Sequence, residues 1–129
     1  MIVVDSSAFV AIRFAEPEAD GFSRAIACAD AVAMAAATYL ECAIVAMRAP
    51  DGRAALDAWI GARRISVVPI NHALAQIAAD AFARYGKGRH PAGLNFGDCF
   101  AYALARSLNA PLLFKGDDFP RTDVMRAVA

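Results

Sequence analysis

Acidic side chains stand beside or inside strongly apolar segments at four separate places in this sequence. Burying a bare carboxylate is costly unless the group is neutralised, paired or bound to a metal. Carboxylate oxygens suit Mg²⁺ or Mn²⁺ rather than zinc, and such an ion can activate water and hold a phosphodiester for in-line attack. The pattern therefore favours metal-dependent phosphodiester hydrolysis by Asp5, Glu41, Asp98, Asp117 and Asp118.

Three of these acids follow short apolar runs that are typical of buried strands. Asp5 ends the run of residues 1–4, and Asp117 and Asp118 come just after the run 111–114. The carboxyl ends of parallel strands meet at one edge of a sheet, where α/β proteins bind ligands. Local alternatives remain, because Asp5 would also serve as a helix N-cap and Gly-Asp-Asp is an ordinary turn sequence.

The other two acids belong to expected helices. Asn95 can cap an apolar helix and leave Asp98 in its first turn, where an anion is favoured for purely local reasons as well. Thr38 can cap another helix, which would place Glu41 in the first turn of that helix. Glu41 would then also fit a capping box with Thr38, bonding back to the backbone instead of facing a site.

Apolar runs alternate with helical periodicity along the chain, which predicts an α/β fold with a parallel sheet and right-handed crossovers. Strands are expected at residues 1–4, 31–35, 65–70 and 111–114, with a short edge strand at 122–125. Helices are expected from Ser6 through Ile12, and over residues 16–28, 38–47, 53–63, 71–85 and 95–105.

The composition bounds the class of protein. A chain of 129 residues that is 59% hydrophobic and 20% charged is expected to fold as one domain, residues 1–129. Its longest apolar run, residues 31–47, is interrupted by an acid and is too short to span a membrane. With no secretory segment recognisable at the start, we expect a soluble cytoplasmic protein.

The cysteines point to packing more than to chemistry. Cys28, Cys42 and Cys99 are widely spaced and contain no CxxC pair, so they suit neither a disulfide framework nor a zinc site. Each lies in an apolar helical stretch and is expected in the core. A nucleophilic pair of Cys99 with His90 is the alternative.

The net charge of zero conceals a possible asymmetry. If a metal neutralises the five acids, 13 basic groups face 13 − 5 = 8 acidic ones. The segment 84–93 is the most basic, and its glycines and proline predict a loop that leads into the Asp98 helix. We expect Lys87, Arg89 and His90 to contact phosphates from this loop; the alternative is a plain, solvated connection.

Four segments together resemble the PIN-domain ribonuclease toxins of VapBC toxin–antitoxin modules. They are Val3-Val4-Asp5-Ser6-Ser7, Tyr39-Leu40-Glu41, Leu94-Asn95-Phe96-Gly97-Asp98-Cys99 and the run from Leu112 to Asp123. The resemblance covers nearly the whole chain and implies a PIN-like three-layer α/β/α sandwich, with a mainly parallel sheet of about four to five strands. It also implies Mg²⁺-dependent endoribonuclease activity (with Mn²⁺ a plausible substitute), homodimerisation and inhibition by a VapB-type antitoxin.

The resemblance also implies site residues. By position, Asp5, Glu41 and Asp98 match the first three acids of the family. The Gly-x-Asp-Phe pattern favours Asp118 as the fourth acid. Asp117 is the alternative, and it would reach the metal through water. Supporting roles fall to Ser7, which is similar to the hydroxyl residue beside the first acid, and to the helix cap Asn95.

Two other classes compete with a nuclease. A phosphotransfer receiver-like domain also gathers acids at strand ends, but it needs adjacent acids after the first strand and an acceptor acid after the third. Asp5 is followed by serines, and the run Val67–Ile70 ends without an acid. A non-catalytic module that only sequesters RNA or a partner is distinguished by testing for Mg²⁺-dependent cleavage.

Overall fold

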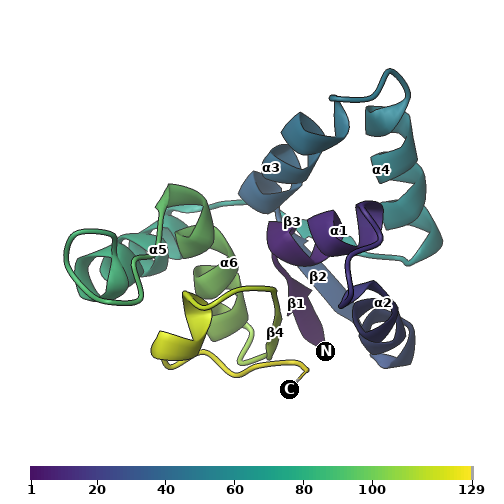
Figure 1. Ribbon diagram of the computed structural model, residues 1–129. Helices are drawn as coiled ribbons and strands as arrows, with labels where there is room; N and C mark the ends of the chain where they lie inside the picture. The colour runs from purple at the N-terminus through teal and green to yellow at the C-terminus, as the bar shows by residue number, and fades with distance from the viewer. Residues whose placement is uncertain (129) are drawn as a thin grey trace.

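A computed structural model of the protein describes residues 1–128, and its centre is a parallel sheet with helices on both sides (Figure 1). The strands are β1 (Ile2–Val4), β2 (Val32–Ala35), β3 (Ser66–Val68) and β4 (Leu112–Leu113), in the order β3-β2-β1-β4. Every strand pair is parallel. The predicted α/β class is confirmed, and the four strands lie within the expected number of about four to five.

Helices connect the strands as expected for parallel crossovers. The described helices are α1 (Ser6–Arg13), α2 (Ala19–Cys28), α3 (Ala36–Ala46), α4 (Gly52–Ala62), α5 (His72–Tyr85) and α6 (Phe96–Ser107), followed by the 3₁₀ helix η1 (Phe119–Arg121). None of the helices in this part of the chain is long and apolar enough to cross a membrane.

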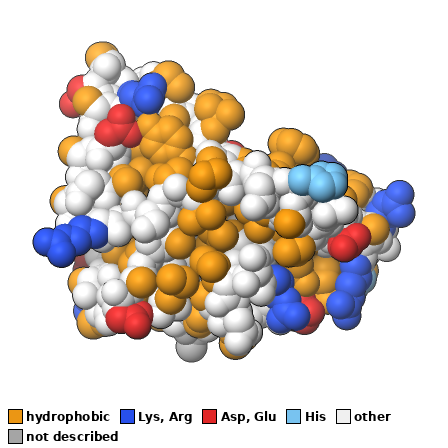
Figure 2. Space-filling view, turned by 180° about the vertical axis from the view of Figure 1, so that it is seen from behind, with side chains coloured by type: hydrophobic (Ala, Val, Ile, Leu, Met, Phe, Trp, Pro, Cys, Tyr) orange, Lys and Arg blue, Asp and Glu red, His pale blue; other side chains and the backbone are white. Residues whose placement is uncertain are grey.

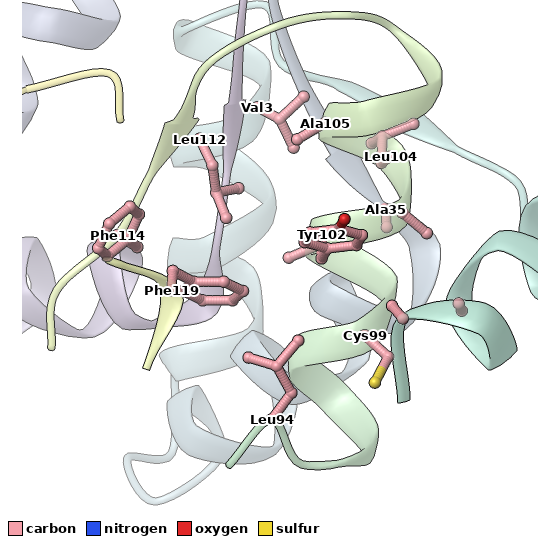
Figure 3. Packing of buried hydrophobic residues seen from close by; sticks show 14 of the residues in the cluster. Val3, Ala35, Leu94, Cys99, Tyr102, Leu104, Ala105, Leu112, Phe114 and Phe119 are labelled. Atoms are coloured by element: carbon pink, nitrogen blue, oxygen red, sulfur yellow. The ribbon is translucent and has the colours of Figure 1, made fainter. Parts of the chain in front are cut away.

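The sheet separates two hydrophobic cores, which gives three layers. Because side chains alternate along a strand, Val3 packs against α5 and α6 while Val4 packs against α1 to α4. In β4, Leu112 lies in the same core as Val3, and Leu113 lies in the same core as Val4. Figure 3 shows the first of these cores, with Tyr102 of α6 facing the side of the sheet that carries Val3 and Leu112. The α/β/α sandwich is confirmed.

Two local predictions are wrong. The α3 helix begins at Ala36 directly after β2, so Thr38 is a buried residue inside the helix and not its cap. Residues 122–125 do not form the expected edge strand; they lie between η1, which ends at Arg121, and a single bridge between Leu112 and Arg126. Thr122 binds locally instead, because its Oγ1 accepts a hydrogen bond from the Val124 N–H at 3.2 Å.

Candidate active site

Asp5 follows the carboxyl end of β1, which is one of the two inner strands of the sheet. Its side chain is 3% exposed, and its Oδ2 accepts hydrogen bonds from the Ser7 N–H at 3.0 Å and the Ser7 hydroxyl at 2.6 Å. Asp5 is thus the N-cap of α1, as the local alternative required. Its Oδ1 is buried without a hydrogen-bond partner. Burial raises the pKa of Asp5, and the Ser7 hydrogen bonds offset this only in part.

Glu41 projects from the second turn of α3, not the first, because the helix starts earlier than predicted. This position excludes the capping box with Thr38. A Cβ built on Gly97 of α6 would overlap the Glu41 carboxylate, so the two helices meet here. Burial, followed by the charges of Asp5 and Asp98, raises the pKa of Glu41 to about 7, and Glu41 Oε1 is buried without a partner.

Asp98 and Asn95 form a reciprocal capping box at the start of α6. The Asp98 N–H donates to Asn95 Oδ1 at 2.8 Å, and the Asn95 N–H donates to Asp98 Oδ2 at 3.0 Å. The local prediction for both residues is confirmed, yet it does not exclude a role in a site. Burial raises the pKa of Asp98 to about 6, with a further contribution from the charges of Asp5 and Asp118 against the lowering effect of the Asn95 backbone.

Asp117 and Asp118 lie in the exposed turn between β4 and η1. Both line the same cleft as the other three acids. Of the two, Asp118 is the residue whose charge raises the pKa of Asp98, so it stands within electrostatic range of that carboxylate. This observation favours Asp118 as the fourth member of the acid cluster.

All five acids face one cleft of about 460 Å³ at the carboxyl edge of the sheet. Ser7 and Asn95 line it too, and so do Ser6, Glu16 and Lys115, which the sequence did not single out. Among residues 1–128, no three His, Cys, Asp or Glu side chains are close enough to enclose an ion directly. Mg²⁺ commonly keeps several waters and takes only one or two carboxylates, a mode that this open arrangement fits.

The carboxylate oxygens of the cleft are chemically suited to bind a divalent cation. Asp5 Oδ1 and Glu41 Oε1 are buried acceptors with no donor, and an unsatisfied buried acceptor is costly. The pKa values of Asp5, Glu41 and Asp98 are all raised in the metal-free state. A bound cation would satisfy the orphaned oxygens and favour the charged carboxylates.

The basic loop lies outside this cleft. Lys87 and Arg89 are exposed, and none of the three predicted RNA-binding side chains lines the acidic cleft. His90 has a structural contact, because its Nδ1 accepts a hydrogen bond from the Ala92 N–H at 3.0 Å. Arg121 of η1 donates to the Pro91 carbonyl at 3.2 Å, so the loop is held next to the turn that carries Asp118.

The cysteine–histidine alternative finds no support. Burial raises the pKa of Cys99 to about 11, which keeps the thiol neutral. Its Sγ donates to the Asn95 carbonyl at 3.2 Å, and His90 Nδ1 accepts from the Ala92 N–H instead. Cys42 is buried as predicted, whereas Cys28 at the end of α2 is exposed, contrary to prediction.

The family model described as PIN domain matches residues 2–125. This chain belongs to the PIN-domain family. Within that family its relatives are VapC proteins. Ribonuclease VapC of Mycolicibacterium smegmatis is 47% identical over 126 residues, covering 95% of this chain and 97% of the relative. Ribonuclease VapC28 of Mycobacterium tuberculosis is 45% identical over 130 residues, covering 98% of each. The chain is therefore a member of the VapC family, and the receiver-like alternative is wrong.

Solved VapC structures share the fold. The sarcin-ricin-loop-cleaving toxin VapC20 of Mycobacterium tuberculosis aligns with a TM-score of 0.76 and 17% identity over 100% of both chains. VapBC2 of Rickettsia felis, solved with a DNA fragment of its promoter, aligns with a TM-score of 0.76 and 14% identity, covering 98% of this chain and 96% of that one. At such identities the likeness supports the PIN fold of the VapC-family chain.

Proposed function

We propose that this VapC-family protein, residues 1–129 as a single PIN domain, is a Mg²⁺-dependent endoribonuclease and the toxin of a type II toxin–antitoxin module. The observation that carries the proposal is the pair of buried, unpartnered oxygens, Asp5 Oδ1 and Glu41 Oε1, in a cleft lined by the five predicted acids and Glu16. The relatives named as VapC ribonucleases support the same substrate class.

The ion would be held by four of these acids. Asp5, Glu41, Asp98 and Asp118 are the proposed metal-binding residues; one or two of them would bind the ion directly and the others would hold its waters. Asp117 would also act through water. When bound, Mg²⁺ supplies a water of lowered pKa and stabilises the leaving oxygen of the phosphodiester. Mn²⁺ is the expected substitute because it accepts the same oxygen ligands.

The neighbouring polar groups fix the orientation of the ligands. Ser7 occupies Oδ2 of Asp5 through two hydrogen bonds, and Oδ1, which has no partner, would be available to a cation. Asn95 fixes Asp98 through the capping box. Support of this kind limits the rotamers of a ligand and so preorganises the site. Asp5 and Asp98 therefore meet the ion without a further loss of side-chain freedom.

RNA would approach over the basic loop before it enters the cleft. Lys87 and Arg89 are exposed and free to contact phosphates, and Arg121 anchors the loop beside Asp118. His90 would contribute from its remaining ring nitrogen, because Nδ1 is already engaged. Replacing Lys87 and Arg89 together by Ala would weaken RNA binding and lower its salt dependence.

Protein partners have apolar surface available. Leu40 and Ile44 lie on one face of α3 and are 57% and 59% exposed, and Met47, the C-cap of α3, is 54% exposed. Phe96 is 79% exposed. Figure 2 shows hydrophobic side chains gathered across the middle of the face opposite to that of Figure 1. Apolar surface of this extent is typical of interaction sites. We propose a homodimer in the cytoplasm that a VapB-type antitoxin inhibits.

The test is RNA cleavage by the purified protein during a Mg²⁺ and Mn²⁺ titration, with a chelator control. Wild type should cleave only with the ion. Asp5→Asn, Glu41→Gln, Asp98→Asn and Asp118→Asn should fold and lose cleavage, whereas Asp117→Asn should keep part of it. Equal cleavage in the chelator would contradict the proposal. Metal-independent RNA binding without cleavage would instead favour the sequestering module.

A further inference from the structure

Lys115 is the one basic side chain among the described residues that line the acidic cleft. It faces six carboxylates there: Asp5, Glu16, Glu41, Asp98, Asp117 and Asp118. Its Nζ lies 3.1 Å from Glu16 Oε1 and 3.3 Å from Glu18 Oε1. The two glutamates come from the turn between α1 and α2, far away in the sequence. Acidic neighbours thus hold the ammonium group of Lys115 at the rim of the cleft.

The backbone of Lys115 is fixed relative to the catalytic acids. The Lys115 N–H donates to Ser7 Oγ at 3.0 Å, and the Ser7 hydroxyl donates to Asp5 Oδ2 at 2.6 Å. Two hydrogen bonds therefore connect Lys115 to Asp5. The ammonium itself is carried on a flexible four-carbon stem, so it can change partner while its Cα stays in place.

The ion pairs that hold the ammonium are weak enough to be exchanged. The side chains of Lys115, Glu16 and Glu18 are 37%, 33% and 38% exposed. Pairs of this exposure are weak, because water screens the charges and both side chains lose freedom on pairing. A phosphate oxygen offers the ammonium a stronger, charge-assisted hydrogen bond. An RNA strand in the cleft can therefore compete for Lys115.

Glu16 and Glu18 have a different role from the helix start that the sequence around Pro17 predicts. Glu16 and Glu18 around Pro17 were expected to start a helix, but Glu18, the N-cap of α2, makes no side-chain capping bond. Both carboxylates form ion pairs with Lys115 instead, and the Glu16 pair is also a hydrogen bond. In the free protein they neutralise the cation, and they compete with phosphate for it.

We propose that Lys115 is a substrate-positioning residue that Glu16 and Glu18 hold in the free protein and that transfers to an RNA phosphate beside the scissile bond. This role rests on the proposed ribonuclease function. It predicts opposite effects on RNA affinity for changes that remove the same ion pairs. Losing the lysine removes a phosphate contact, whereas losing the glutamates removes the competitors.

The experiment measures binding of a fluorescently labelled single-stranded RNA of mixed sequence by anisotropy, in Mg²⁺ buffer over a salt series. All variants carry Asp98→Asn to prevent cleavage. Lys115→Met should weaken binding several-fold and lower the log–log salt slope by about 0.7, the value for one single-strand phosphate contact. Lys115→Arg should restore both. The double change Glu16→Gln with Glu18→Gln should tighten binding several-fold.

Arg63→Met is the matched control, because Arg63 lines a different pocket beside the residues that precede β2. It should leave affinity and salt slope unchanged. A merely structural role for Lys115 would make Lys115→Met and the glutamate double variant change binding in the same direction, and that result overturns the proposal. Melting temperatures identify any variant that does not fold, and Lys115→Gln, which keeps much of the stem, then replaces Lys115→Met.

The two proposals fail in distinguishable ways. If wild type cleaves RNA while Lys115→Met binds it with unchanged affinity and slope, the role of Lys115 alone is overturned. If wild type neither cleaves nor binds RNA under any metal condition, the ribonuclease function fails, and the role of Lys115 fails with it.

Discussion

The carboxylate of Glu41 occupies the space that a side chain at Gly97 would fill. A Cβ on Gly97 would overlap Glu41 Oε2 and lie 2.6 Å from Glu41 Cδ. Glu41 belongs to α3, and Gly97 is the second residue of α6. The missing side chain therefore lets an acid from one helix lie against the positively polarised first turn of another, next to Asp98.

Gly97→Ala should separate activity from stability. Alanine is the better helix former by about 1 kcal/mol, and the atoms it displaces belong to the flexible end of Glu41. We expect an unchanged or higher melting temperature but cleavage reduced roughly ten- to a hundredfold, because a metal ligand is misplaced. Calorimetry and a cleavage assay measure the two effects.

Gly61→Ala is the control for that substitution. Gly61 lies in α4, and a Cβ there would meet nothing within 4 Å. It should stabilise the protein by a similar amount and leave cleavage unchanged. Equal activity of Gly97→Ala and Gly61→Ala would show that Glu41 need not lie against α6.

Asn95→Ala should cost stability and activity together. The cap hydrogen bond that it removes is worth about 1 kcal/mol. That bond holds the backbone N–H of Asp98, so its loss loosens the first turn of α6 that carries the Asp98 carboxylate. Asn71→Ala offers a matched control, because Asn71 caps α5 through an equivalent bond from the Leu74 N–H at 2.9 Å. Denaturant unfolding should give similar losses for both variants. Only Asn95→Ala should weaken Mg²⁺-dependent cleavage.

The metal-free protein should become more stable as the pH falls moderately. The folded-state pKa of Glu41 is raised from 4.5 to about 7 and that of Asp98 from 3.8 to about 6. A raised carboxyl pKa means that the folded state binds protons more readily than the unfolded state. Its stabilising effect is present at low pH and is lost as the pH rises through the folded value. In chelator, the melting temperature should therefore rise from about pH 8 to about pH 5.

Glu41→Gln checks the origin of that dependence. The amide removes the buried charge, so the variant should melt higher than wild type near pH 8 and show a flatter pH profile. A variant with the wild-type profile would assign the dependence to other groups.

Mg²⁺ should stabilise wild type most at alkaline pH, where the carboxylates are charged. A ligand at a hundredfold excess over its Kd contributes about 2.7 kcal/mol to stability. The melting temperature of wild type should rise with Mg²⁺ concentration, and that of Asp98→Asn should rise much less. An identical rise for both would argue against Asp98 as a ligand.

The sequence by itself determined the features that depend on local chemistry. Apolar runs followed by acids located β1 with Asp5 and β4 with Asp118, because a strand buried on both faces must be apolar and its end must turn into solvent. The caps Asn71 and Asn95 were also predictable, since a capping bond spans only three residues.

Only the tertiary structure decided which distant groups meet. The packing of α3 on α6 set Glu41 against Gly97, and the fold joined Lys115 to Glu16 across 99 residues of sequence. The α3 helix also begins at Ala36 and not at the predicted residue 38, because the chain turns into the helix directly after β2. Sequence periodicity indicates which face of a helix or strand is buried. The contacts across that face depend on how the helices and strands pack in three dimensions.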